Sequence, residues 1–226
     1  MVNNEKVGIG IITCNRKETF RSLFEEVCNA NDVDCVVIVK NLEHDYADND
    51  PRKLIEGAKK VISKDFHYVY ETKKLGIAHN KNLAARHLLE NGCEHIFIVE
   101  DDIKLKDVSV FRKYIETAKE FKLEHLNFGR SFDTMILHDW LKPVAIISGK
   151  NHKLDIFNRL SGDFSYFTAN ALRTAGLYNE KYINALDHCE HTYRMSLLGF
   201  YTPFYAFADI ENSTDYIEDT GTHTTI

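Results

Sequence analysis

The sequence predicts an α/β protein whose first part is a doubly wound, mostly parallel sheet and whose second part is smaller and mixed or antiparallel. Over the first hundred residues, short β-branched runs alternate with amphipathic stretches, which is typical of parallel strands joined by helices. The later strand-like runs are short and favour antiparallel pairing. Hydrophobic residues form 44% of the 226 residues, enough for a substantial core.

Each element of the first part has local signals at its ends. Asn15 can cap a helix, and Asp50-Pro51 combines an N-cap with a first-turn proline. Gly92 is a C-terminal stop for the preceding helix. The expected strands are Val7–Thr13, Val33–Lys40, His67–Tyr70 and His95–Val99, and the expected helices begin at Asn15, run from Asp50 to Ile62, and lie between Gly76 and Asn91.

The second part begins with a helix that Asp107 can cap. Short strands are then expected at Leu126–Phe128, Val144–Ile147, Leu154–Phe157 and Phe164–Phe167, and short helices at Asn170–Leu177 and Asp187–Leu198. The polar tail from Glu211 to Ile226 is expected to be a loop. Because there is no repeat, low-complexity linker or Pro/Gly-rich boundary, we expect residues 1–226 to form a single domain with two halves, 1–105 and 106–226.

Composition and charge narrow the classes of function and location. The net charge of −6 argues against a nucleic-acid partner, because such a surface needs clustered Lys and Arg. The five cysteines are scattered without CxxC pairs, so we expect no disulfide framework and no structural zinc site, and a reducing, cytoplasmic location. With no leader and no apolar run long enough to be a transmembrane segment, any membrane association is expected to be peripheral, at the inner face.

The strongest functional signal is an apolar strand that stops on three acids, Glu100-Asp101-Asp102. Adjacent carboxylates repel one another, so they are kept either fully solvated or beside a cation. Mg²⁺ and Mn²⁺ prefer hard oxygen ligands and are commonly held by one or two carboxylates together with substrate phosphates. A solvated turn is the alternative, but the carboxyl end of a buried strand is where open α/β sheets bind ligands.

A second motif, Gly76–Asn82, lies just before this strand and opens a helix. Its small residues would let backbone amides approach a phosphate, and Lys81 would add a positive charge. A surface lysine with no ligand is the alternative. Gly8-x-Gly10 lacks the third glycine of a dinucleotide-binding fingerprint, so a Rossmann dehydrogenase is not predicted.

A third motif, Asp187–Arg194, opens another expected helix. Residues three and four apart share a helix face, so Asp187, Glu190, His191 and Arg194 lie on one side, with His188 beside His191. This face could hold a general base, a metal ligand, or a structural salt bridge between Glu190 and Arg194. Imidazole suits either of the first two tasks.

Together these motifs resemble the GT-A glycosyltransferases, especially their inverting family-2 group. Val7–Arg16 is similar to that group's first strand and T-x-N-R turn, and Gly76–Asn82 to its G-x-A-x-A-R-N element with lysine in the arginine place. Glu100–Asp102 occupies the DXD position. Asp187–Arg194 falls where the family carries E-D-x-D-x-x-x-R, but His188 stands at the position of the catalytic base. Lys40-Asn41 also departs from the two aspartates often found there, which puts uracil recognition in doubt.

The resemblance implies a Rossmann-like GT-A sheet and a role for each matching residue. Asp102 would bind Mn²⁺ or Mg²⁺, with His191 as a further metal or diphosphate contact, and either Asp187 or His188 would be the catalytic base. The nucleotide or donor sugar would be bound by Thr13, Asn15, Arg16, Lys81, Asn82, Glu100, Asp101, Glu190 and Arg194.

The implied function is inverting transfer of a hexose or N-acetylhexosamine from a nucleotide-sugar donor, UDP-linked, to a hydroxyl of a saccharide or lipid-linked saccharide acceptor, as in polysaccharide biosynthesis. Residues 1–105 would form the nucleotide-sugar-binding half, and residues 106–226 the half with the acceptor site and catalytic base. Two alternatives stay open. One is a sugar-nucleotide pyrophosphorylase, which would want a Gly-rich basic loop after the first strand; the other is a non-catalytic nucleotide- or saccharide-binding module of a larger polymerase.

Overall fold

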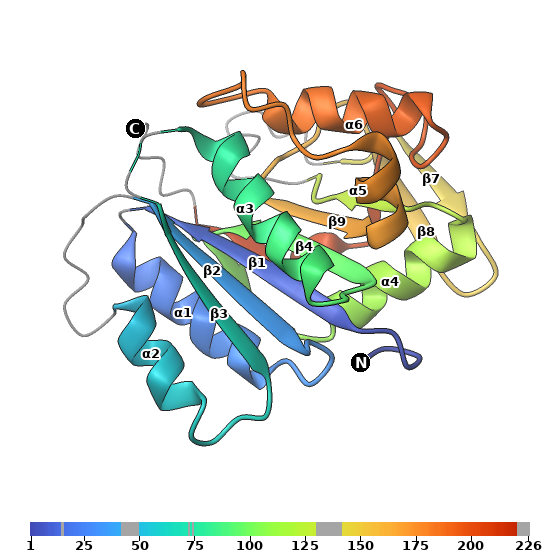
Figure 1. Cartoon of the computed structure of the whole chain (residues 1–226). Helices are drawn as coiled ribbons and strands as arrows, with labels where there is room; N and C mark the ends of the chain where they lie inside the picture. Colours follow the sequence, from blue (N-terminus) through green and yellow to red (C-terminus); the bar gives the residue numbers. More distant parts are fainter. Residues whose placement is uncertain (15, 42–49, 72, 74, 130–141, 221–226) are drawn as a thin grey trace.

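The computed structural model describes residues 1–14, 16–41, 50–71, 73, 75–129 and 142–220. Its centre is a six-stranded sheet with the strand order β3-β2-β1-β4-β9-β6 (Figure 1). These strands are β1 (Val7–Thr13), β2 (Cys35–Asn41), β3 (Asp65–Glu71), β4 (His95–Glu100), β6 (His125–Asn127) and β9 (Phe164–Thr168). β1 to β4 are parallel, so their carboxyl ends lie at the same edge of the sheet.

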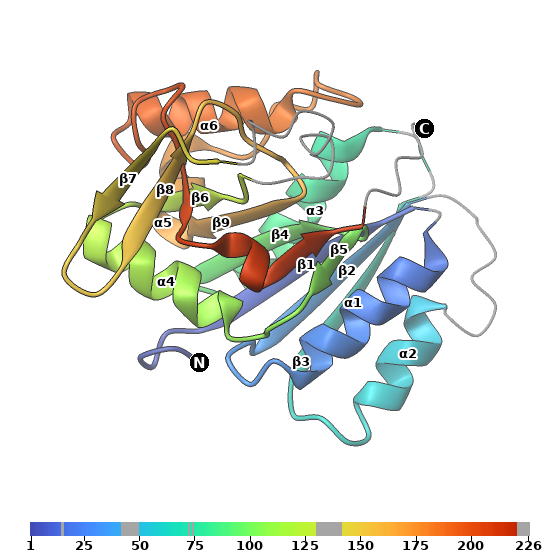
Figure 2. The ribbon, with the colours of Figure 1, turned by 180° about the vertical axis from the view of Figure 1, so that it is seen from behind.

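Helices cover both faces of this sheet. They are α1 (Lys17–Asn29), α2 (Pro51–Ala58), α3 (Ile77–Glu90), α4 (Val110–Phe121), α5 (Ala169–Ala175) and α6 (Asp187–Leu197). Helix α3 lies on the face seen in Figure 1, and α1, α2 and α4 lie on the face seen in Figure 2. Every residue of β1 and β2 is buried, as expected for parallel strands that are covered on both sides.

The second part of the chain returns to the central sheet in the opposite direction. β9 is antiparallel to β4, and Phe164 at its start pairs with Val99 near the end of β4. The start of β9 therefore lies at the same edge as the ends of the parallel strands. A separate antiparallel sheet, in the order β10-β8-β7, is formed by β7 (Ala145–Ser148), β8 (Lys153–Phe157) and β10 (Phe207–Ile210). The predicted fold class is thus confirmed.

Some local predictions differ from the structure. The tail from Glu211 was expected to be a loop, but it contains a 3-10 turn at Ser213–Asp215 and the strand β11 (Ile217–Asp219), which pairs with β5 (Ile103–Leu105). These three-residue strands are too short to show a periodic pattern. Helix α2 ends at Ala58 rather than Ile62. The prediction that Asn15 caps α1 lies outside the described residues.

The glycines of β1 let α3 pack directly on the sheet. A Cβ atom on Gly10 would lie 2.6 Å from the Ala84 Cβ, and one on Gly8 would lie 2.5 Å from the Leu88 Cδ2. Both distances are too short for real atoms, so these positions need glycine because of close approach. The Gly8-x-Gly10 pattern therefore has a packing role.

We expect Gly10→Ala to destabilise the protein by about 1–3 kcal/mol, because the added methyl group overpacks the contact between β1 and α3. Gly57→Ala in α2 is the matched control, since a Cβ there meets nothing within 4 Å among the described residues. It should be neutral or stabilising by roughly 0.5–1 kcal/mol. Urea unfolding of both variants measures the difference, and equal midpoints would contradict the packing role.

Candidate active site

The carboxyl ends of β1 and β4 bring a threonine, an arginine and two aspartates together. The Thr13 hydroxyl donates to Asp101 Oδ2 at 2.7 Å. Arg16 Nη1 lies 2.9 Å from Asp101 Oδ1 and 2.8 Å from Asp102 Oδ2. These residues meet because β1 and β4 are direct neighbours in the sheet. Four residues that the sequence assigned to the donor and metal site thus lie side by side, whereas Asn15 is outside the described residues.

Asp102 is the least satisfied carboxylate of this group. It is only 7% exposed, and its Oδ1 has no hydrogen-bond partner within the described part of the chain. Burial, and then the charge of Glu100, raise the pKa of Asp102 to about 8, although Arg16 opposes this shift. In contrast, both oxygens of Asp101 accept hydrogen bonds. A positive charge beside Oδ1 would therefore stabilise the ionised form of Asp102.

The structure adds a carboxylate that the sequence analysis did not single out. Asp163 stands just before β9, and its backbone oxygen accepts from the Glu100 amide at 2.8 Å. Burial, and then the charge of Asp219, raise the pKa of Asp163 to about 7. Its place before an apolar run was visible in the sequence, but the pairing of that strand with β4 was not. The acidic cluster therefore includes Asp163 in addition to Glu100, Asp101 and Asp102.

A divalent cation fits this group of side chains. No three His, Cys, Asp or Glu side chains in the described ranges form a closed metal cage. Mg²⁺ and Mn²⁺ nevertheless commonly use only one or two carboxylates and complete their shell with substrate phosphates. The buried and unpartnered Oδ1 of Asp102 is a hard oxygen ligand of that kind.

Lys81 connects this acidic cluster to the third motif. It lies on α3 and is 1% exposed, and its Nζ is 2.9 Å from Glu100 Oε1 and 3.1 Å from Asp187 Oδ2. The same ammonium group donates to the Gly162 carbonyl at 2.9 Å. Burial alone would lower the pKa of Lys81, but Asp187 and Glu100 outweigh it and raise this pKa well above its ordinary value. Lys81 is therefore charged and enclosed.

Asp187 and His188 form a pair at the start of α6. Asp187 is 2% exposed, and its Oδ1 lies 3.6 Å from His188 Nδ1, whereas the His188 side chain is 22% exposed. Burial would raise the pKa of Asp187, but Lys81 and His188 outweigh it and leave this pKa below the ordinary range. Burial would likewise lower the pKa of His188, but the neighbouring Asp187 and Cys189 side chains outweigh it and raise this pKa to about 9.

The start of α3 is covered by the segment that precedes α6. The Ile77 amide donates to the Ile183 carbonyl at 2.8 Å. A Cβ on Gly76 would lie only 2.4 Å from the same oxygen, so this glycine allows the close approach. The sequence suggested that backbone amides here bind a phosphate, but the Ile77 amide already has a protein partner.

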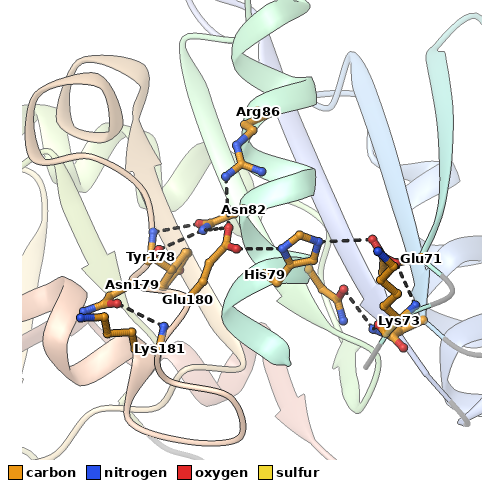
Figure 3. Close-up of polar contacts among 11 residues, drawn as sticks. Glu71, Lys73, His79, Asn82, Arg86, Tyr178, Asn179, Glu180 and Lys181 are labelled. Atoms are coloured by element: carbon orange, nitrogen blue, oxygen red, sulfur yellow. Dashed lines mark hydrogen bonds and ion pairs between the residues drawn. The ribbon is translucent and has the colours of Figure 1, made fainter. Parts of the chain in front are cut away.

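Asn82 anchors the same segment to α3 (Figure 3). Its Nδ2 donates to the Tyr178 carbonyl at 2.9 Å and to Glu180 Oε1 at 2.8 Å, and its Oδ1 accepts from the Tyr178 amide at 2.8 Å. Glu180 also contacts His79 and Arg86, and these hydrogen bonds, with that of Asn82 first, lower the pKa of Glu180 to about 2. The side chain of Asn82 is thus engaged with protein atoms, which favours a structural role over nucleotide binding.

Glu190 and Arg194 bind each other and the backbone. Arg194 Nε lies 2.7 Å from Glu190 Oε1, and Arg194 Nη2 donates to the Leu177 carbonyl at 2.7 Å. A further bond joins Arg194 Nη1 to the Ala175 carbonyl at the end of α5. This is the salt-bridge alternative from the sequence analysis, and it fixes α6 against α5.

His191 lies in the core rather than among the acids. Its Nε2 bonds to the Gly176 carbonyl at 2.8 Å, and its ring centroid is 4.3 Å from that of Tyr178 and 5.3 Å from that of Phe167. Burial lowers the pKa of His191 to about 3, so the ring is neutral. The structure does not bring His191 into contact with Asp102, and we interpret it as a core residue instead of a metal ligand.

Comparisons with known proteins support the fold. No protein-family model and no curated protein sequence matches the chain. Among solved structures, a mannosyltransferase from Pyrobaculum calidifontis in complex with GDP-Man and Mn²⁺ superposes with a TM-score of 0.64 at 16% identity, over 86% of this chain and 52% of that one. S. aureus TarS superposes with a TM-score of 0.66 at 12% identity, over 95% and 36% of the two chains. Residues 1–349 of TarS in complex with UDP give a TM-score of 0.60 at 13% identity, over 94% and 60%.

The chain therefore has a GT-A-like glycosyltransferase fold. It spans between about a third and three fifths of the length of these three structures. Because their identity to this chain is low, these matches support the architecture alone.

We expect Asp102→Asn to stabilise the metal-free protein at pH 8 by about 1–3 kcal/mol, the usual cost of a buried polar group without a partner. A raised carboxyl pKa means that ionisation destabilises the folded state as the pH rises from the ordinary value of 3.8 to about 8. The gain should therefore vanish near pH 4. Urea unfolding with a chelator measures this, with the exposed Glu90→Gln as a control that should match wild type at every pH. A destabilised Asp102→Asn at pH 8 would contradict our interpretation of the site.

Proposed function

We propose that this chain is an inverting, metal-assisted glycosyltransferase that moves a hexose or N-acetylhexosamine from a nucleoside-diphosphate sugar to an acceptor hydroxyl. The observation that carries the proposal is the joining of two distant motifs through one buried ammonium group: Lys81 bonds to Glu100 of the acidic triplet and to Asp187 of the base motif. In this proposal, the end of β4 forms the side of the leaving group and the start of α6 the side of the nucleophile, near the edge where open sheets bind ligands.

In the proposed reaction, the acceptor oxygen attacks the anomeric carbon on the face opposite the nucleotide. The new carbon–oxygen bond forms as the bond to the diphosphate breaks, the nucleoside diphosphate leaves with the electron pair, and the acceptor proton passes to a protein base. Thr13 and Arg16 fix Asp101 and Asp102 at the leaving-group side. A divalent cation held by Asp102 would neutralise the charge that develops on the diphosphate.

We propose His188 as the base and Asp187 as the residue that orients it. Asp187 is buried, its Oδ2 contacts Lys81 and its Oδ1 faces His188, so its low pKa makes it a poor proton acceptor. His188 is more exposed, and its raised pKa makes the neutral ring a stronger base. An aspartate that holds a histidine in place and supports its charged form is a known division of roles in catalysis.

The donor, acceptor and location follow from the resemblance. We propose a UDP-linked donor, a saccharide or lipid-linked saccharide acceptor and a cytoplasmic location, with peripheral membrane contact if the acceptor is lipid-linked. Within the described residues, no helix is long and apolar enough to cross a bilayer. The division into a donor half, residues 1–105, and an acceptor half, residues 106–226, is part of the same proposal.

A donor panel tests the function directly. We expect slow, Mn²⁺-dependent hydrolysis of one nucleotide sugar from a panel of UDP-sugars and GDP-mannose, with release of the nucleoside diphosphate and an anomer of inverted configuration detected by NMR. Asp102→Asn should lose the dependence on Mn²⁺. Tight binding without turnover on any donor and acceptor would favour the non-catalytic module, and release of pyrophosphate from a nucleoside triphosphate would favour the pyrophosphorylase.

We expect His188→Ala to lower kcat by about 10²–10⁴-fold, the usual contribution of a positioned base. In wild type, kcat should rise with pH up to about 9, because only the neutral ring accepts a proton. Asp187→Asn removes the carboxylate that contributes most to raising this pKa, so the midpoint of its pH profile should shift to lower pH. Near-wild-type turnover in His188→Ala, together with inactive Asp187→Asn, would assign the base to Asp187 instead.

A further inference from the structure

The Lys81 ammonium group is surrounded by protein acceptors, with two hydrogen bonds and one further ion pair. A lysine ammonium group carries three donors. Three acceptors lie within hydrogen-bond distance of its Nζ: Glu100 Oε1 at 2.9 Å, the Gly162 carbonyl at 2.9 Å and Asp187 Oδ2 at 3.1 Å. With 1% of the residue exposed, a donor phosphate would have to displace one of these protein partners.

The three acceptors come from three separate segments. Glu100 ends β4, Gly162 lies shortly before β9, and Asp187 begins α6. A Cβ on Gly162 would lie only 2.5 Å from His188 Nδ1, so the segment that Lys81 holds by its carbonyl also packs against the histidine. The Lys81 side chain thus fixes the end of β4, the Asp187 carboxylate and the segment that packs against the His188 ring.

We infer that Lys81 is a positioning residue that sets the Asp187–His188 pair against the end of β4, and that it does not bind the donor. This inference rests on the proposed function and differs from the nucleotide-binding role that the resemblance implied for this residue. A lysine enclosed in this way acts through its neighbours, because its ammonium group is buried and already bound to protein acceptors.

Kinetics and binding separate the two roles. Lys81→Met should lower kcat about 10²-fold, since small misplacements of catalytic groups have effects of this size. The Kd for UDP with Mn²⁺, from calorimetry, should stay within about threefold of wild type. Arg86→Met is the matched control on the same helix: it contacts Glu180 and neither Glu100 nor Asp187, so kcat should stay within about threefold of wild type. A tenfold or larger rise in Kd for Lys81→Met would overturn the inference.

A second comparison does not depend on catalytic activity. Asp187→Asn/Lys81→Met leaves no unpaired Asp187 charge and should bind UDP as tightly as Asp187→Asn alone. In urea unfolding, Lys81→Met should lower the midpoint less in the Asp187→Asn background than in wild type. In that background there is no Asp187 charge for the substitution to leave without a partner. Equal losses in both backgrounds would overturn the positioning role. If wild type binds no nucleotide at all, the proposed function fails, while this unfolding cycle still decides how Lys81 acts on Asp187.

Discussion

Repulsion between buried carboxylates is the constraint around which this structure is arranged. Glu100, Asp101 and Asp102 follow one another where β4 ends, and the antiparallel return of β9 adds Asp163 beside them. Burial, and then the negative charges around each group, raise the pKa of Asp102 to about 8 and that of Asp163 to about 7. Such a cluster is tolerated only where fixed cations or a bound ion balance it.

Two cations from opposite faces of the sheet supply part of that balance. Arg16 precedes α1 on one face and bridges Asp101 and Asp102, and Lys81 lies on α3 on the other face and reaches Glu100. The close packing of α3, which Gly10 permits, is what brings an enclosed lysine to the edge of the sheet. Neither cation reaches Oδ1 of Asp102 by a hydrogen bond, so this oxygen is available to the divalent cation of the proposed reaction.

The sequence was informative wherever one segment determines its own structure. The apolar run before Glu100 and the alternation with helices predicted the parallel strands and the edge at which Arg16 meets the acids. The partners of Lys81 could not be predicted, because they depend on which strand β9 pairs with and on the path of the segment before α6. The same holds for His191: its helical position beside Glu190 suggested a site, but only tertiary packing shows that its ring lies against Tyr178.

The pair at the start of α6 shows how a single replacement can redistribute roles. With an aspartate at position 188, two adjacent carboxylates would share the environment of Lys81, and the exposed one would be the natural base. A histidine there turns repulsion into attraction, so Asp187 becomes more firmly ionised, and the base that we propose is an imidazole with a pKa near 9. Such a base gains strength, but the fraction in the neutral form near pH 7 is small. The chemistry is then favoured by alkaline conditions, or by a bound donor whose accompanying cation lowers the pKa of His188.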